Sequence, residues 1–185
     1  SHNAAAYYTH TAGLKVVAPA TPYDAKGLVK SAIRDDGPVI VLEGELAYNE
    51  KGEVPKEEYL VPLGQADIKR MGKDVTVVTY GRPVKVALEA AVELEERGID
   101  TEVVDLRSLK PLDEERVYRS VRKTNRCVVV DEAWPAAGVG SHVGWLVSRN
   151  CFDFLDAPVE LVTMPDVSMP YNRHLERAVQ VSMEK

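Results

Sequence analysis

Apolar and polar residues follow one another along the chain in patterns that predict strands and helices in turn. Residues 14–19 and 39–42 are short apolar runs of the kind found in buried strands. Between them, apolar residues recur at the i, i+3, i+4, i+7 spacing of a helix with one buried face, and Thr21 is placed to cap that helix. Residues 14–42 are therefore predicted to form one strand–helix–strand unit with parallel strands.

A polar stretch separates this unit from a longer alternating series. Residues 47–73 contain many Glu, Lys, Gly and Pro and show no sustained period, which predicts a linker. After it we expect strands at 75–80, 101–106, 127–130 and 159–162, and helices at 83–97, 114–124, 139–150 and 174–184. The order predicts an α/β fold, in which the end of one parallel-sheet domain is joined to a second, nearly complete domain.

Composition narrows the classes of protein that this sequence fits. The chain has 185 residues, 45% hydrophobic and 28% charged, which is ordinary for a globular protein. Its net charge of −6 argues against a general nucleic-acid or anionic-membrane binder, and no apolar run approaches the length of a membrane span. Two cysteines, Cys127 and Cys151, exclude a disulfide framework. No leading signal peptide is visible, and the first three residues are not typical of a natural start, so we expect sequence upstream of Ser1.

Few residues suggest chemistry of their own. The four histidines are scattered, so a metal site is unsupported, and His142 is expected to be a structural histidine on an apolar helix face. Cys127 lies in a predicted strand, which favours a buried, inert thiol. Glycines in residues 136–144 precede a helix; we favour a tight, closely packed turn over a phosphate site, because their spacing is not the dinucleotide fingerprint.

The end of the first helix is the other candidate. Asp35-Asp36-Gly37 follows it, and the last carbonyl groups of a helix are unpaired and partly negative. Either a bound cation or an ordinary helix end fits this pattern. The residues alone thus indicate an α/β protein without a self-contained active site.

Several stretches together resemble one known family. They are residues 13–19, 23–39, 74–82, 105–113, 154–158 and 169–171. In this combination they are similar to the beta subunits of the pyruvate dehydrogenase decarboxylating component, within the transketolase-like thiamine-diphosphate family. The resemblance implies that residues 1–46 end a pyrimidine-binding domain, that 47–73 are a linker, and that 74–185 are a transketolase C-terminal domain with a mostly parallel sheet and helices on both faces.

The same resemblance places the catalytic residues outside this sequence. Ser1 matches the serine of a His-Ser-Gln motif, and His2 stands where the family usually has glutamine. The motif's histidine, and the glutamate that activates the cofactor, are expected upstream of Ser1. Ser1 and His2 are therefore the residues nearest to the active site, no catalytic residue is expected in this fragment, and the fragment alone is expected to be inactive.

The implied activity is oxidative decarboxylation of pyruvate and reductive acetylation of a lipoyl group, on the way to acetyl-CoA. The implied cofactors are thiamine diphosphate and magnesium, shared with an alpha subunit in an alpha2–beta2 tetramer that includes a second beta subunit. Further implied partners are the subunit-binding and lipoyl domains of an acyltransferase core, with Asp156 contacting the former. A potassium ion held by main-chain oxygens is implied at four positions: Ala32, Ile33, Asp35 and Gly37.

Two alternatives stay open at this point. The first is a beta subunit that acts on branched-chain 2-oxo acids or on acetoin, because such subunits share much of the pattern. The second alternative belongs to another functional class: a non-catalytic module for assembly and docking onto the acyltransferase core. The expected location is the bacterial cytoplasm, or the mitochondrial matrix in a eukaryote.

Overall fold

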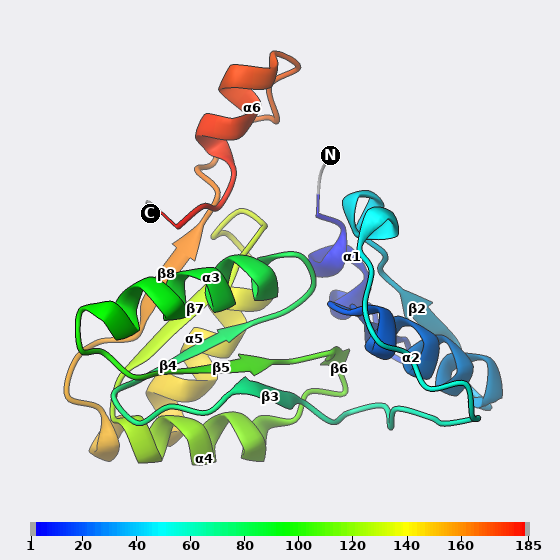
Figure 1. Cartoon of the computed structure of the whole chain (residues 1–185), viewed down its shortest axis with the longest axis horizontal. Coiled ribbons are helices and arrows are strands. Elements are labelled where there is room, and N and C mark those ends of the chain that lie inside the picture. The colour runs from blue at the N-terminus through cyan, green and yellow to red at the C-terminus, as the bar shows by residue number, and fades with distance from the viewer. Residues whose placement is uncertain (1–2, 184–185) are drawn as a thin grey trace.

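The computed structural model describes residues 3–183, which form two β-sheets with helices packed around them (Figure 1). The smaller sheet has the strand order β2-β1-β6. Its strands are β1 (Lys15–Val17), β2 (Val39–Val41) and β6 (Ser108–Lys110). β1 and β2 are parallel, as predicted, and helix α2 (Pro22–Arg34) connects them. The backbone N–H of Asp24 donates to the Thr21 hydroxyl at 3.1 Å, which confirms Thr21 as the helix cap.

The larger sheet has five strands in the order β3-β5-β4-β7-β8. They are β3 (Asp67–Arg70), β4 (Val75–Thr79), β5 (Thr101–Asp105), β7 (Cys127–Asp131) and β8 (Glu160–Thr163). All neighbours are parallel except β3, which pairs antiparallel with β5 at the edge. The α/β class with a mostly parallel sheet is confirmed.

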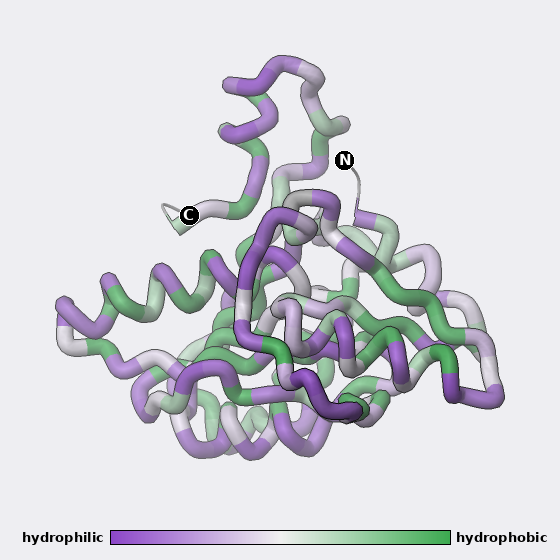
Figure 2. The backbone as a smooth tube through the Cα atoms, turned by 45° about the vertical axis from the view of Figure 1, so that its right-hand side comes forward, coloured by the Kyte–Doolittle hydropathy of each residue, from purple (hydrophilic) through white to green (hydrophobic). Residues whose placement is uncertain are grey.

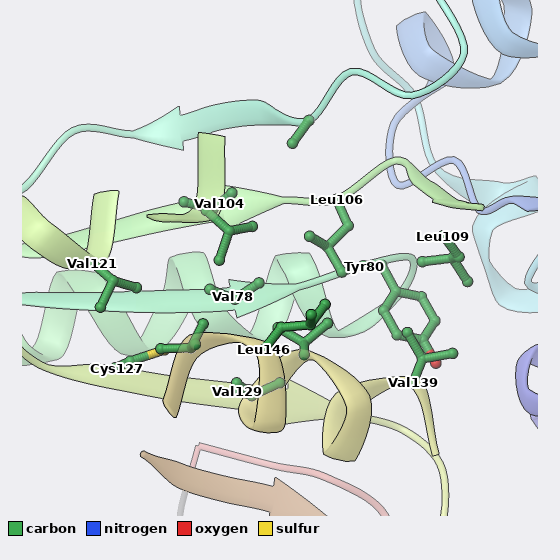
Figure 3. Close-up of a cluster of buried hydrophobic side chains, with 14 of the residues drawn as sticks. Val78, Tyr80, Val104, Leu106, Leu109, Val121, Cys127, Val129, Val139 and Leu146 are labelled. Atoms are coloured by element: carbon green, nitrogen blue, oxygen red, sulfur yellow. The ribbon is translucent and has the colours of Figure 1, made fainter. Parts of the chain in front are cut away.

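Helices cover both faces of the five-stranded sheet. They are α3 (Pro83–Glu96), α4 (Glu114–Thr124) and α5 (Val139–Asn150). The face of the sheet that carries Val77 packs against α3. The opposite face, which carries Val78, packs against α4 and α5 (Figure 3). Because successive strand side chains point to opposite faces and helices cover both faces, the central strands carry apolar residues in succession, such as Val77-Val78 and Val103-Val104. Figure 2 shows hydrophobic, green stretches of the tube within the body of the molecule.

Three short elements of the N-terminus and the expected linker were not predicted. Helix α1 (Ala5–His10) precedes β1, and its residue Ala5 is completely buried. The expected linker 47–73 contains the strand β3 and, at its start, the 3₁₀ turn η1 (Glu45–Asn49). β3 escaped the periodicity analysis because Ile68 is its only apolar residue, so it shows no alternation.

The C-terminal segment also differs from the prediction. After the short turn η2 (Phe152–Phe154) and β8, helix α6 (Arg173–Val179) stands away from the sheets and ends well before the predicted residue 184 (Figure 1). The backbone is extended at Gln180, and Val181 is then buried next to the sheet. Burial of Val181 against Val77 and Met164 thus ends the helix.

Candidate functional site

The strand order of the five-stranded sheet indicates where a ligand-binding site is expected. β4 connects through α3 to β5 on one side, whereas the next connection passes through α4 to β7 on the other side of β4. In open α/β sheets such a reversal leaves a crevice beyond the carboxyl ends of the two strands, where ligands bind. Here the corresponding position lies beyond Thr79 of β4 and Asp131 of β7.

A chain of hydrogen bonds links the N-terminal residues to these strand ends. The amide of Asn3 donates to the Tyr80 hydroxyl at 3.2 Å, and this hydroxyl donates to Asp131 Oδ1 at 2.6 Å. The backbone N–H of Gly140, in the first turn of α5, donates to Asp131 Oδ2 at 2.7 Å. We call Asn3, Tyr80, Asp131 and Gly140 the Tyr80 junction. It joins the N-terminal segment to the ends of two strands and the start of a helix.

Burial governs the ionisation of the Tyr80 junction. Tyr80 is 4% exposed and Asp131 is 1% exposed. Burial raises the pKa of Asp131, and the hydrogen bonds from Tyr80 and Gly140 oppose that rise. Burial, reinforced by the charge of Asp131, holds the pKa of Tyr80 well above its usual value. Both oxygens of the Asp131 carboxylate accept a hydrogen bond, so this junction is fully satisfied.

The glycine-rich turn before α5 is a packing feature, as predicted. A Cβ atom on Gly138 would lie 2.7 Å from the Trp134 carbonyl oxygen, and one on Gly140 would lie 2.7 Å from the Asp131 Cβ atom. The lack of side chains lets the turn approach Asp131 closely enough for the Gly140 N–H to bind it. The buried Asp131 carboxylate takes the place that an anion would need at the start of α5.

A cleft of about 650 Å³ opens beside this turn. Its lining includes His10 of α1, Lys110 of β6 and His142 of α5. Lys110 Nζ donates to the carbonyl oxygens of Thr9 at 2.8 Å and Thr11 at 2.9 Å, so its ammonium group holds the end of α1. The lysine therefore ties α1 to the neighbouring sheet.

His142 and the cysteines were assessed from the sequence, and the structure places each of them. His142 was expected to be a structural histidine on an apolar face of α5; it is exposed, and its ring stacks on Trp145 with centroids 5.9 Å apart. The buried residues of α5 include its neighbours Val143 and Val147. Cys127 and Cys151 are free and buried, and burial raises the pKa of Cys127 to about 12, which confirms an inert thiol.

The four positions implied for potassium lie at one end of α2. Ala32 and Ile33 are in its last turn, Asp35 caps it, and Gly37 follows. Lys15 Nζ donates to both Asp35 carboxylate oxygens, at 2.6 and 2.7 Å, and the Gly37 N–H donates to one of them at 2.8 Å. These bonds, led by that from Lys15, lower the pKa of Asp35. Since an ammonium group already neutralises this carboxylate, only main-chain oxygens are left to bind an added cation.

Asp156, implied as a partner-binding residue, lies on the surface after η2. Its carboxylate is 3.2 Å from the Arg126 guanidinium, and both side chains are more than half exposed. Arg122, on the same helix end, lies over the Phe154 ring at 5.4 Å. The neighbourhood of Asp156 is therefore basic and aromatic.

The residues implied to be nearest the active site, Ser1 and His2, lie outside the described residues. Within residues 3–183, no group of three His, Cys, Asp or Glu side chains is arranged to hold a metal ion. The described part of the chain therefore does not by itself fit a magnesium–diphosphate site. No helix in this part is long and apolar enough to cross a bilayer.

Sequence reasoning missed the Tyr80 junction altogether. Its four residues are spread over 138 positions, and no motif contains more than one of them. One signal was available: Tyr80 and Asp131 each come at the end of a predicted strand, and the carboxyl ends of neighbouring parallel strands share one edge. Only the strand order shows that these two strands are neighbours.

Comparison with known families divides the chain into two parts. Residues 64–185 match the transketolase C-terminal domain, and residues 1–51 match the transketolase pyrimidine-binding domain. Among solved structures, a chain described as "Split gene transketolase, inactive beta4 tetramer" is similar with a TM-score of 0.78 and 30% identity, over 97% of this chain and 56% of that one.

Three curated relatives show the range of named functions. The pyruvate dehydrogenase E1 component subunit beta of Rickettsia conorii is 50% identical over 95% of this chain and 54% of its own length. The mitochondrial subunit of the same name from Rattus norvegicus is 49% identical over 93% of this chain and 49% of its own. An acetoin:2,6-dichlorophenolindophenol oxidoreductase subunit beta from Bacillus subtilis is 49% identical over 91% and 49%, respectively. The chain thus spans about half the length of the curated relatives that it matches.

Proposed function

The chain belongs to the transketolase C-terminal domain family, and from this premise we propose that it is part of the beta subunit of a thiamine-diphosphate-dependent pyruvate dehydrogenase component. The observation that carries the proposal is identity of about half of all positions, over nearly the whole chain, with bacterial and mitochondrial subunits of that name. The proposed reaction is oxidative decarboxylation of pyruvate, with transfer of the acetyl group to a lipoyl group and onward to coenzyme A.

The proposed assembly supplies what the described residues lack. An alpha subunit would hold the diphosphate and magnesium, because residues 3–183 contain no side-chain cluster for a metal ion. Two alpha and two beta subunits would form the working tetramer, which would act on the lipoyl domain of an acyltransferase core. The bacterial cytoplasm or the mitochondrial matrix is the proposed location, in keeping with the relatives' sources.

The direct test is reconstitution of the intact subunit. The full-length beta subunit is mixed with its alpha partner, thiamine diphosphate and magnesium, and carbon dioxide release from pyruvate is measured. We expect release that requires all four components, and none from residues 1–185 alone. Reconstitution that gives no pyruvate-dependent release would refute the proposed activity.

An acetoin-cleaving enzyme is the second candidate, because the Bacillus subtilis relative matches about as well. The same reconstituted tetramer is assayed with pyruvate, acetoin and a branched-chain 2-oxo acid at equal concentrations. The proposal expects the highest kcat/KM with pyruvate. A higher value with acetoin or with the branched substrate would reassign the subunit within its family.

A docking role for Asp156 is proposed alongside the activity. A basic subunit-binding domain would need to displace Arg126 from Asp156, so the expected effect of this acid on affinity is small and salt-dependent. Asp156→Lys is compared with the nearby Asp153→Lys in titrations of the tetramer with that domain. The role predicts weaker binding for Asp156→Lys only. Equal affinity of the two variants would remove Asp156 from the interface, and binding without any turnover would favour a purely structural module.

A structural potassium ion at the end of α2 is a further proposal, supported by the gathering of Ala32, Ile33, Asp35 and Gly37 there. Thermal unfolding in potassium chloride is compared with sodium chloride at the same ionic strength. We expect a higher midpoint in potassium, as binding to the folded state requires. Identical midpoints would argue against the site.

A further inference from the structure

Charged side chains from three separate segments meet where α2 packs against the edge of the five-stranded sheet. Asp24 comes from the first turn of α2, Asp67 and Lys69 from β3, and Asp105 and Arg107 from the end of β5 and the turn after it. We call these five residues the charge junction. It joins the family's pyrimidine-binding segment to its C-terminal domain through residues that lie far apart in the sequence.

Lys69 is the centre of the charge junction. Its ammonium nitrogen lies 2.6 Å from Asp24 Oδ2, 2.9 Å from Asp67 Oδ2 and 3.6 Å from Asp105 Oδ2. Its side chain is 12% exposed. Three carboxylates therefore pair with this one cation, and Asp105 is the farthest of the three from it.

Arg107 supplies the second cation. Its Nη2 atom lies 2.7 Å from Asp24 Oδ1 and 2.9 Å from Asp67 Oδ2, and its backbone N–H donates to Asp105 Oδ1 at 3.0 Å. The backbone of Arg107 is in the left-handed region with φ of +55°, a conformation that non-glycine residues rarely adopt. The turn is thus held in this conformation while the guanidinium group points back to α2.

The charges do not balance. Three carboxylates face two cations, while Asp24 and Asp105 are completely buried. The charge of Arg116, on α4, also helps to lower the pKa of Asp67. Arg116 itself pairs with Asp113, with 3.7 Å between Arg116 Nε and Asp113 Oδ2. Among the described residues, Asp105 Oδ2 has no hydrogen-bond donor. If Asp105 were ionised in this position, its Oδ2 would be a buried charged oxygen without a hydrogen-bond donor, with the Lys69 ammonium 3.6 Å away, which is unfavourable.

We propose that the charge junction binds one exchangeable proton, held on Asp105, and that loss of this proton loosens the contact of α2 with β3 and the five-stranded sheet. The bound proton makes the junction neutral and removes the repulsion between Asp105 and Asp24. Release of the proton restores an excess negative charge inside the contact. The pyrimidine-binding segment is therefore coupled to the C-terminal domain more tightly at lower pH.

The ionisation of the groups agrees with this geometry. Burial raises the pKa of Asp105 to about 7, and the charge of Asp24 adds to the rise, whereas Lys69 and Arg107 oppose it. Burial also acts on Asp67, but there hydrogen bonding and charge from Lys69 prevail and lower its pKa. For Lys69 the hydrogen bond to Asp24 and the other carboxylates outweigh burial and raise its pKa. The proton is therefore assigned to Asp105 rather than to Asp67.

The sign of the pH effect follows from the direction of the shift. A carboxyl whose pKa is higher in the folded than in the unfolded state binds more protons when folded. Between the ordinary value of 3.8 and about 7, this group therefore reduces stability as the pH rises. The reduction is complete above the folded value.

The primary experiment uses the unmodified 185-residue chain. Its aspartate carboxyl ¹³C signals are followed by NMR from pH 4 to 9, with Asp105 assigned by comparison with Asp105→Asn. We expect one aspartate signal, that of Asp105, to titrate near neutral pH. Titration of Asp105 near its ordinary pKa of 3.8 would overturn the proposal. If Asp105→Asn does not fold, the Asp105 signal is assigned from through-bond spectra of the unmodified chain instead.

The second experiment measures the mechanical consequence. Hydrogen exchange of the α2 and β3 amides, corrected for the intrinsic effect of pH, is measured at pH 5.5 and 8.5. We expect protection to fall at least fivefold at the higher pH in the wild type and to stay constant in Asp105→Asn. The matched control Asp153→Asn changes an exposed carboxyl and should behave like the wild type. Protection that does not change with pH in the wild type would overturn the coupling.

Discussion

The Tyr80 junction and the charge junction both join the N-terminal segment to the C-terminal domain, and they are built in opposite ways. In the Tyr80 junction one carboxylate, Asp131, receives one donor at each oxygen, and glycines allow the backbone to approach it. In the charge junction three carboxylates compete for two cations, and one buried oxygen of Asp105 has no donor among the described residues. Both contacts contain carboxylates that are 0–1% exposed, Asp131 in one and Asp24 and Asp105 in the other, so burial of a carboxylate alone does not distinguish them.

The comparison shows that the number and geometry of donors decide how a buried contact responds to its surroundings. A carboxylate with two short hydrogen bonds fixes one arrangement of the chain, since either bond is costly to lose. A cluster with unequal charges has a protonation state that changes with pH, and its strength changes with it. The first junction is therefore expected to set geometry and the second to adjust the tightness of the contact.

Lys69→Met should have the largest effect of the changes that separate the two contacts. It leaves Asp24, Asp67 and Asp105 with Arg107 as their remaining cation, and removing one partner of a buried ion pair typically costs about 3–5 kcal/mol. Urea unfolding at pH 7 measures the loss. The control is Lys85→Met, which removes an exposed pair with Glu50 and should cost less than about 1 kcal/mol. Equal losses in the two variants would mean that the charge junction contributes no more than a surface pair.

Asp131→Ala should rank next and tests the Tyr80 junction. It leaves the Tyr80 hydroxyl and the Gly140 N–H without their acceptor, each a buried donor that costs about 1–3 kcal/mol, so we expect a loss of about 2–4 kcal/mol. Thermal and urea unfolding give the value. Asp166→Ala, at an exposed position, is the control and should change stability by less than about 0.5 kcal/mol. An unchanged midpoint for Asp131→Ala would show that other groups replace the carboxylate.

Gly27→Ala tests the packing of α2 next to the charge junction, where the segment around Val61 crosses the helix. A Cβ atom at position 27 would lie 2.4 Å from the Val61 Cγ2 atom and 3.0 Å from the Tyr59 ring. The added methyl group forces this segment to shift, at an expected cost of about 1–3 kcal/mol. Gly44→Ala has open space and is the control. If the alanine at position 27 stabilises the protein as it does in an unpacked helix, the crossing segment does not pack closely on α2.

Tyr80→Phe should have the smallest effect, because it removes one hydroxyl group and leaves the ring in place. Asp131 loses one of two donors and Asn3 loses its acceptor, so a loss of about 1–2 kcal/mol is expected. Hydrogen exchange at Ala5 and its neighbours should also become faster, since Asn3 holds the start of α1. Tyr48→Phe, at an exposed position, serves as the control and should leave both measurements unchanged. Faster exchange in both variants would place the effect outside the junction.

The elements of the fold that were predicted from the sequence are those with strong local signals. Asp113 caps α4 as expected from its position, and α5 has the bounds that its apolar spacing indicates. β3 and β6 were missed because each is short and owes its pairing to a distant strand rather than to its own pattern. The charge junction was missed for a related reason: Asp24, Lys69 and Asp105 meet only in three dimensions. A one-dimensional pattern contains no information on which charges will be buried together.

The short strand β6 determines how the molecule responds to denaturation. Residues 108–110 follow the C-terminal domain's β5 in sequence, yet they pair with β1 and complete the sheet of the pyrimidine-binding segment. Melting either sheet therefore removes support from the other, so a calorimeter should record one cooperative heat-absorption peak for both parts of the chain.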